Sequence, residues 1–246
     1  MKKQLIFLLC LCTIQTAIGQ LRELKQADIK YVEGIYYLAE NNALADGILK
    51  DWYENGQLGL ECTIENGELN GSYKKWYDNG QLYYDSIYKN NKPDQLERVW
   101  YTDGQLSKST NYKNGIKHGE SKTWFPNGQM RGKVNYNQGK FEGEYKVWYE
   151  DGQLRYDSFY KNDKMHGHFK SYTASGYLVI DAMYDNGKAT FEKAYMPGGK
   201  DAFKSSFTEK TFKDGEMVSK KVFYDYKLYS ETRYVNGEQT SYKTFD

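Results

Sequence analysis

The chain has 246 residues, of which 17% are aromatic, and it contains 25 Tyr, 23 Gly and 3 Pro. This composition excludes a disordered chain, because disordered chains are poor in aromatic side chains. With 34 basic and 33 acidic residues the formal net charge is +1, so no overall attraction to nucleic acid is expected. Flat side chains and abundant glycine together favour β-strands joined by tight turns.

The first residues have the pattern of a secretory signal peptide over residues 1–19. Lys2 and Lys3 precede an apolar run over residues 5–12, and small residues follow at Ala17 and Gly19, so we expect cleavage before Gln20. A retained anchor is the alternative, although the run is shorter than the about 20 residues that span a bilayer. We therefore expect an exported protein, located in the periplasm, on the cell surface or in the medium.

Cleavage would also change the cysteine content and the charge of the chain. Two of the three cysteines would be lost, which leaves Cys62 and allows no intrachain disulfide. Two of the 34 basic residues and no acid would be lost, and the resulting charge near −1 offers no overall attraction to an anionic membrane.

Two sequence phrases recur with a period of 24 residues. The sequence WYENGQL of residues 52–58 returns in similar form from residues 76, 100, 124 and 148 and, with Tyr in place of Trp, from residue 172. A second phrase, most often Tyr-Lys-Asn, keeps the same period and begins at Tyr88, Tyr112, Tyr136, Tyr160 and Tyr184. Six copies in register indicate a repeat array.

The residues between these phrases alternate in polarity. Leu58, Leu60, Cys62 and Ile64 are separated by mostly polar residues, and a period of two with one apolar face predicts a half-buried strand. The Asn-Gly or Asp-Gly pair before each such strand predicts a two-residue type I′ turn. The expected fold is all-β: an elongated, twisted, single antiparallel sheet of tandem 24-residue hairpins. The recurring tyrosines share the apolar face and are expected to form a thin core.

The ends of the chain depart from the period. Residues 20–33 lack the pattern and are expected to be an N-terminal lead-in, a partial unit begins near Gly34, and regular repeats are expected over residues 34–188. Residues 189–246 are expected to form divergent repeats and a cap, with an insertion at residues 196–199. Terminal repeats diverge because they must cover an exposed sheet edge.

The run YKNGIKHG of residues 112–119, followed by WFPNGQ of residues 124–129, resembles the MORN repeat, and more closely the bacterial MORN repeat variant. The resemblance implies an elongated antiparallel sheet used for protein or lipid contacts. Some bacterial members of similar sequence are labelled as antitoxins of toxin–antitoxin pairs. Asp94-Gln95 and residues 189–191 depart from the repeat pattern, so we expect distorted second turns there.

A basic residue stands two positions before each recurring Trp or Tyr, and therefore on the same face of its strand. A two-residue loop would place an acid opposite four of these basic residues, and such pairs are structural, each contributing about 0.2–1 kcal/mol. Arg98 would face Ser109 and Lys122 would face Lys133, so both basic residues would be unpaired. The six basic residues are Lys50, Lys74, Arg98, Lys122, Lys146 and Lys170.

The middle repeats are therefore the candidate binding patch, because cations beside aromatic rings suit anionic glycans, an acidic protein face or lipid headgroups. The patch comprises Arg98, Trp100, Lys122, Trp124, Arg131 and Lys133.

No feature of the sequence indicates an enzyme, a metal site or a cofactor. The chain has no Gly-x-Ser-x-Gly, phosphate-binding or His-Glu-x-x-His motif. His118 and His166 stand two repeats apart, too far to share an ion, and His166 and His168 lack a third ligand at metal-site spacing. We expect an exported, non-catalytic module that binds a protein or a glycan, or acts as a scaffold. The alternatives are an antitoxin or immunity-type protein and a peripheral lipid-binding protein.

Overall fold

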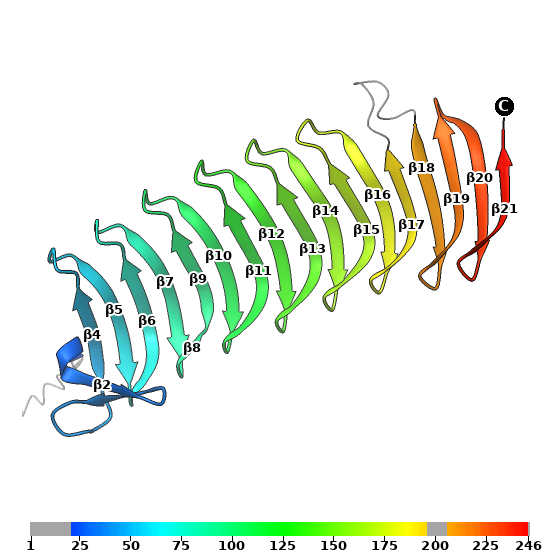
Figure 1. Ribbon diagram of the computed structural model, residues 1–246. Helices are drawn as coiled ribbons and strands as arrows, with labels where there is room; N and C mark the ends of the chain where they lie inside the picture. The colour runs from blue at the N-terminus through cyan, green and yellow to red at the C-terminus, as the bar shows by residue number, and fades with distance from the viewer. Residues whose placement is uncertain (1–20, 196–205, 246) are drawn as a thin grey trace, which may run out of the picture.

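The computed structural model describes residues 21–195 and 206–245 (Figure 1). The predicted signal peptide, its cleavage site and the predicted insertion at residues 196–199 lie outside the described residues. No helix in the described part is long and apolar enough to cross a membrane.

Nineteen of the described strands belong to one sheet. Figure 1 shows an elongated single layer of curved strands that follow one another in chain order. β1 pairs in parallel with β4, and the strands from β4 onward pair antiparallel with their neighbours. The predicted all-β fold of stacked hairpins is confirmed. The strands of this sheet are β1 (Glu23–Lys25), β4 (Gly47–Trp52), β5 (Leu58–Glu65), β6 (Glu68–Trp76), β7 (Leu82–Lys89), β8 (Lys92–Pro93), β9 (Gln95–Trp100), β10 (Leu106–Lys113), β11 (Ile116–Trp124), β12 (Met130–Asn137), β13 (Lys140–Trp148), β14 (Leu154–Lys161), β15 (Lys164–Tyr172), β16 (Leu178–Asp185), β17 (Lys188–Tyr195), β18 (Phe207–Lys213), β19 (Glu216–Tyr224), β20 (Lys227–Val235) and β21 (Glu238–Thr244).

The first turn of each repeat is longer than the sequence predicted. Between β6 and β7, only Gly80 has a positive φ, of 83°, and its N–H donates to the Tyr77 carbonyl at 3.0 Å. A two-residue type I′ turn needs positive φ at both central residues, so that prediction is wrong. The predicted cross-strand partners are nevertheless correct, because a bulge after Lys75 restores the register and leaves Lys74 opposite Asp85.

The second turn is the two-residue one. Asn114 and Gly115 both have positive φ, of 51° and 81°, as a type I′ turn requires. Asn162 and Asp163 replace the Asn-Gly pair at one turn, with φ of 50° and 65°. Asn and Asp tolerate this region better than other residues with a side chain, so the turn persists without glycine.

The two predicted distortions take different forms. The second turn of the first of these units is regular, with φ of 49° and 62° at Asn90 and Asn91, so the predicted turn distortion is wrong. The irregularity lies further along the strand, at Gln95, whose φ is 81° and where the strand is interrupted between β8 and β9. At the second, the turn is regular and β17 is continuous. The register changes instead: Lys193, rather than the periodic Ala194, lies opposite Asp181.

Side chains of the first turn join each repeat to the next. The hydroxyl of Tyr101 donates to the Trp124 carbonyl at 2.8 Å, and Asn55 Nδ2 donates to the Asp78 carbonyl at 2.7 Å. A Cβ at Gly80 would lie 2.5 Å from Gln57 Oε1 of the preceding repeat. The recurring Trp-Tyr-x-Asn-Gly-Gln phrase is therefore an inter-repeat contact as well as a turn. The same tyrosine hydroxyl bond recurs at Tyr53, Tyr77 and Tyr149.

Phe125 occupies the position of these tyrosines and has no hydroxyl. We expect Phe125→Tyr to stabilise the protein by about 0.5–1.5 kcal/mol, the typical net contribution of a hydrogen bond, by donating to the Trp148 carbonyl. Tyr101→Phe should destabilise it by a similar amount. Urea unfolding midpoints at constant m-value test both changes, and shifts of the same sign in the two variants would contradict the expectation.

The buried apolar core lies at the N-terminal end. β2 (Ile29–Val32) and β3 (Ile35–Leu38) form a separate hairpin. The antiparallel repeats of the large sheet therefore begin at β4 and not near Gly34, where they were expected. A 3-10 turn, η1 (Gln26–Asp28), leads into the hairpin. Burial raises the pKa of Cys62 to about 12, so its thiol stays protonated. The buried cluster comprises Leu24, Ile29, Ala45, Leu49, Cys62 and Ile64.

The recurring tyrosines pack between repeats, as predicted. The Tyr136 ring lies 5.0 Å from Phe141, and Tyr160 lies 5.6 Å from the same ring, centroid to centroid. These tyrosines are half-buried, because a single layer leaves part of each ring facing solvent. Burial is the main cause of a raised pKa at Tyr112, Tyr160 and Tyr184.

Candidate binding surface

The predicted basic positions belong to one row of charges that crosses the sheet. In the charge row each residue lies opposite the next on the neighbouring strand, and basic and acidic residues alternate over most of its length. From β4 to β21 it comprises Lys50, Glu61, Lys74, Asp85, Arg98, Ser109, Lys122, Lys133, Lys146, Asp157, Lys170, Asp181, Lys193, Glu209, Lys221, Glu231 and Lys243.

The alternation fails in the middle of the sheet. Ser109 and Lys133 stand where acids would continue the pattern, so Lys122, Lys133 and Lys146 follow one another on β11, β12 and β13. Like charges directly opposite each other are destabilising. The middle repeats therefore carry an arrangement that the other repeats avoid.

Two glutamates beside the row bind these lysines. Glu120 contacts Lys122 and lies 3.1 Å from Lys133, and Glu144 lies 3.4 Å from Lys146. The prediction that Lys122 would be unpaired is therefore wrong, because same-strand neighbours at i and i+2 supply the acids. Arg98 is also paired: its guanidinium binds Asp85.

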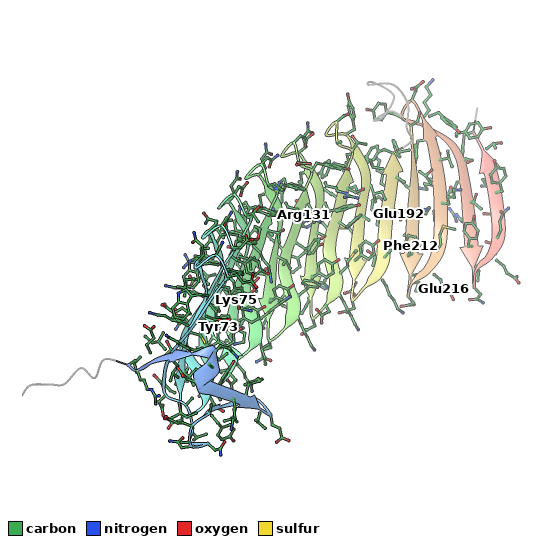
Figure 2. All side chains as sticks on the ribbon, turned by 60° about the vertical axis from the view of Figure 1, so that its left-hand side comes forward. Tyr73, Lys75, Arg131, Glu192, Phe212 and Glu216 are labelled. Carbon is green, nitrogen blue, oxygen red and sulfur yellow. The ribbon has the colours of Figure 1, made fainter. Side chains whose placement is uncertain are left out.

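The six predicted patch residues do not form one surface. Arg98, Lys122 and Lys133 share the charge row, and the Arg98 guanidinium lies 5.5 Å from the centre of the Trp100 ring. Arg131 is the extra residue of a bulge, between Met130 and Gly132, and does not belong to the row. Its guanidinium lies 5.7 Å from the Phe125 ring. Figure 2 shows side chains on both faces of the sheet and Arg131 near its middle.

Trp124 of the patch is half-buried, like Trp100. Its carbonyl accepts the hydrogen bond from the Tyr101 hydroxyl. The structure therefore gives Trp124 a role in joining repeats. The candidate surface that remains is the central part of the charge row, Arg98–Ser109–Lys122–Lys133–Lys146, with its flanking glutamates.

Glu120 links the pH dependence of stability to this surface. Hydrogen bonds from Lys122 and then Lys133 outweigh burial and lower its pKa. A carboxyl with a lowered folded pKa stabilises the fold above its unfolded pKa of about 4.3, and this contribution disappears as the pH falls through the folded value. We expect Glu120→Gln to lose less stability than the parent protein between pH 6 and pH 3.

Urea unfolding at a series of pH values measures this difference. The exposed Glu54 provides the control, since Glu54→Gln should follow the parent curve. If Glu120→Gln loses as much stability between pH 6 and pH 3 as the parent protein, the Glu120 ion pairs do not cause the acid sensitivity.

One buried ionic group was missed by the sequence analysis. Glu97 is 8% exposed, its carboxylate accepts from Lys108 Nζ at 2.9 Å, and it also accepts from the Tyr84 hydroxyl at 3.1 Å. Burial tends to lower the pKa of Lys108, but the bond to Glu97 and its charge raise it overall. The available signal was an acid at a repeat position where Tyr73 and Tyr145 stand in other repeats.

Two of the three histidines lie beside carboxylates. His166 Nδ1 lies 3.2 Å from Asp185, and His168 Nε2 lies 3.2 Å from Asp157. In the described ranges no three His, Cys, Asp or Glu side chains gather where they could hold a metal ion.

Tandem antiparallel hairpins in one open layer, joined by a recurring turn, define a β-hairpin repeat protein. The MORN repeat variant family matches residues 45–66, 69–90, 96–114, 117–138 and 141–162. Residues 45–162 are therefore five tandem repeats of the MORN repeat variant family. The shortest match, at residues 96–114, belongs to the repeat in which the strand is interrupted before β9.

Comparison with other proteins adds no functional assignment. No curated protein matches the chain. Among solved structures, a chain in the crystal structure of TcdB2-TccC3 is similar over 85% of this chain and 14% of its own length, at 9% identity and a TM-score of 0.21. The similarity therefore spans a small part of that chain.

Proposed function

We propose that this protein is an exported, non-catalytic repeat module that binds an anionic protein or glycan along the middle of its sheet. The observation that carries the proposal is the run of Lys122, Lys133 and Lys146 on three neighbouring strands. Repeat arrays expose long surfaces suited to macromolecules, and residues that break a stabilising pattern mark functional sites.

The geometry of the lysines supports contact with an extended partner. Neighbouring strands lie about 4.8 Å apart, so the three ammonium groups follow a line across the sheet. Glu120 and Glu144 hold them in place, and an incoming anion would compete with these half-exposed carboxylates. Such contacts weaken as salt screens them.

Two matched triple variants test the surface. Lys122→Gln, Lys133→Gln and Lys146→Gln are combined in one protein, and Lys170→Gln, Lys193→Gln and Lys221→Gln in the other, so that both lose three positive charges from the charge row. The immobilised chain from residue 20 is incubated with a cell-envelope extract and, separately, with polygalacturonate. Retained protein and uronic acid are then measured.

We expect the central variant to retain at least about tenfold less, because charge-assisted contacts contribute about 1.5–3 kcal/mol each. The peripheral variant should retain as much as the parent protein. Equal losses in the two variants, or none in the central one, would refute the proposal.

Export is the second part of the proposal, supported by the basic, apolar and small-residue segments of residues 1–19. Expression of the full chain in a bacterial host, followed by mass spectrometry of the envelope and medium fractions, should detect a product that begins at Gln20. A full-length product confined to the cytoplasm would contradict export.

A further inference from the structure

A hollow of about 390 Å³ interrupts the sheet surface beside β12, and Gly132 lies in its lining. Gly132 occupies the repeat position that holds Tyr156 in the next unit and Lys108 in the preceding one, and Leu60, Tyr84 and Ile180 elsewhere in the array. Alternation directs the Gly132 position to the face opposite the side chains of the charge row, while Lys133 and Lys146 of that row also line the hollow. The hollow therefore lies where the other units carry a large side chain, which is a tyrosine ring in two of them. We call it the central hollow.

The backbone does not explain the glycine. Gly132 is not among the residues with positive φ, so any residue could adopt its conformation. A Cβ there would meet Thr123 Oγ1 at 3.1 Å and the Lys146 carbonyl at 3.7 Å, which a small movement of the threonine side chain would accommodate. What glycine provides here is the empty space itself.

Aromatic rings form one wall of the central hollow. Tyr136, Phe141 and Tyr145 line it, with centroids 5.0 Å apart for Tyr136 and Phe141 and 5.9 Å apart for Phe141 and Tyr145. Aromatic faces pack against the apolar face of a planar or pyranose ring. The hollow thus has an apolar wall of aromatic rings against which a ligand ring could pack.

Cations stand around the same space. Lys117 Nζ lies 4.9 Å from the centre of the Tyr136 ring, and Lys117, Arg131 and Lys108 all line the hollow. Glu97 neutralises Lys108. Within the described residues, no carboxylate lies within ion-pair distance of Lys117 or Arg131. Two uncompensated cations therefore border an aromatic-lined hollow.

We propose that the central hollow binds the carboxylated ring of a uronic acid residue in an anionic glycan, an inference that rests on the proposed binding function and names the ligand class. The aromatic wall receives the ring, and Arg131 and Lys117 bind the carboxylate, the guanidinium in two-pronged fashion. An Asp or Glu side chain of a protein has the charge but no ring. A neutral sugar has the ring but no charge.

Calorimetric titration with tetragalacturonate tests this directly on the chain from residue 20. Gly132→Tyr introduces the ring that Tyr84 and Tyr156 carry at this repeat position and should lower the affinity at least about 30-fold by filling the space. Arg131→Gln keeps the space and should lower the affinity about 10- to 100-fold, since a hydrogen bond to a charged group is lost. Neutral galactotetraose and a poly-glutamate peptide should bind at least about tenfold more weakly than tetragalacturonate.

Arg155→Gln is the matched control. Arg155 follows Arg131 by one repeat, and its guanidinium lies 5.4 Å from the Tyr149 ring and 4.9 Å from the Tyr156 ring, where Tyr156 occupies the position of Gly132. This substitution should leave the affinity unchanged. Thermal unfolding of each variant establishes that it is folded, and Arg131→Gln tests the site independently should Gly132→Tyr fold poorly.

Unchanged tetragalacturonate affinity in Gly132→Tyr or Arg131→Gln, or equal binding of the poly-glutamate peptide, overturns the inference. Absence of binding to the parent chain overturns it as well. The proposed function fails separately, because its test depends on Lys122, Lys133 and Lys146 and on retention of protein as well as of glycan. If retention of the partner depends on these lysines but tetragalacturonate does not bind, the central hollow is not a uronic acid site, and the charge row remains the proposed binding surface.

Discussion

Ile64→Ala should lower the free energy of unfolding of the N-terminal end by about 2–5 kcal/mol, the cost of emptying a well-packed aliphatic site. Ile64 is 0% exposed and packs with Leu24, Leu49 and Cys62 under the N-terminal hairpin. Among the described residues of the single-layer part of the sheet, the completely buried side chains are small ones such as Thr110 and Ala182, so the effect should be larger here than elsewhere in the array.

Hydrogen exchange measures this effect better than a single melting temperature, because repeat arrays can unfold locally from one end. Amides of β4 and β5 should lose protection in Ile64→Ala, while those of β19 and β20 should keep it. Ile116→Ala is the control, since Ile116 is 51% exposed. Equal loss of protection in the two variants would argue against a localised N-terminal core.

Gly47→Ala should separate β1 from β4 and detach the N-terminal cap. Gly47 has a φ of 149°, and a Cβ there would lie 2.2 Å from the Arg22 carbonyl oxygen and 3.3 Å from Leu24 Cδ1. The nearest obstacle is backbone, so the strand itself must move. That movement would break the Ile48 N–H to Arg22 hydrogen bond of 2.8 Å and expose Leu24 to solvent.

We expect a destabilisation of several kcal/mol from these combined losses. Gly56→Ala is the matched control: its φ is 82° and no atom lies within 4 Å of the added Cβ, so only the strain of a left-handed residue, about 1–2 kcal/mol, applies. Protease cleavage near residue 30 should accelerate in Gly47→Ala and not in Gly56→Ala. Equal cleavage rates would show that the β1–β4 contact does not hold the cap.

Much of the charge row could be predicted from the sequence. The pairing of Lys74 with Asp85 and the opposition of Lys122 and Lys133 follow from the repeat period and strand alternation, and both are observed. The predicted registers were correct although the predicted turn was not. The first turn is longer than two residues, and the adjacent bulge compensates for the extra residues, so the register beyond the bulge is the one that a two-residue turn would give.

The parts of the site that could not be predicted depend on contacts outside the repeat period. Glu120 binds Lys122 and Lys133 from a position beside the row, and the bulge at Arg131 separates it from the residues with which it was grouped. The hollow at Gly132 could not be predicted, because it depends on which side chains surround a position that has none of its own. The N-terminal hairpin packs over β5 although it lies outside the repeat.

The 24-residue period, the strands, the second turns and the cross-strand register of the charge row were determined by sequence alone, because each depends on alternation along a strand or on the φ preferences of Asn and Gly. The tertiary structure decided the length of the first turn, the partners of Lys122 and Lys133, the cap over Ile64 and the existence of the central hollow. These features arise where side chains distant in sequence meet, and local sequence patterns do not predict how such side chains pack.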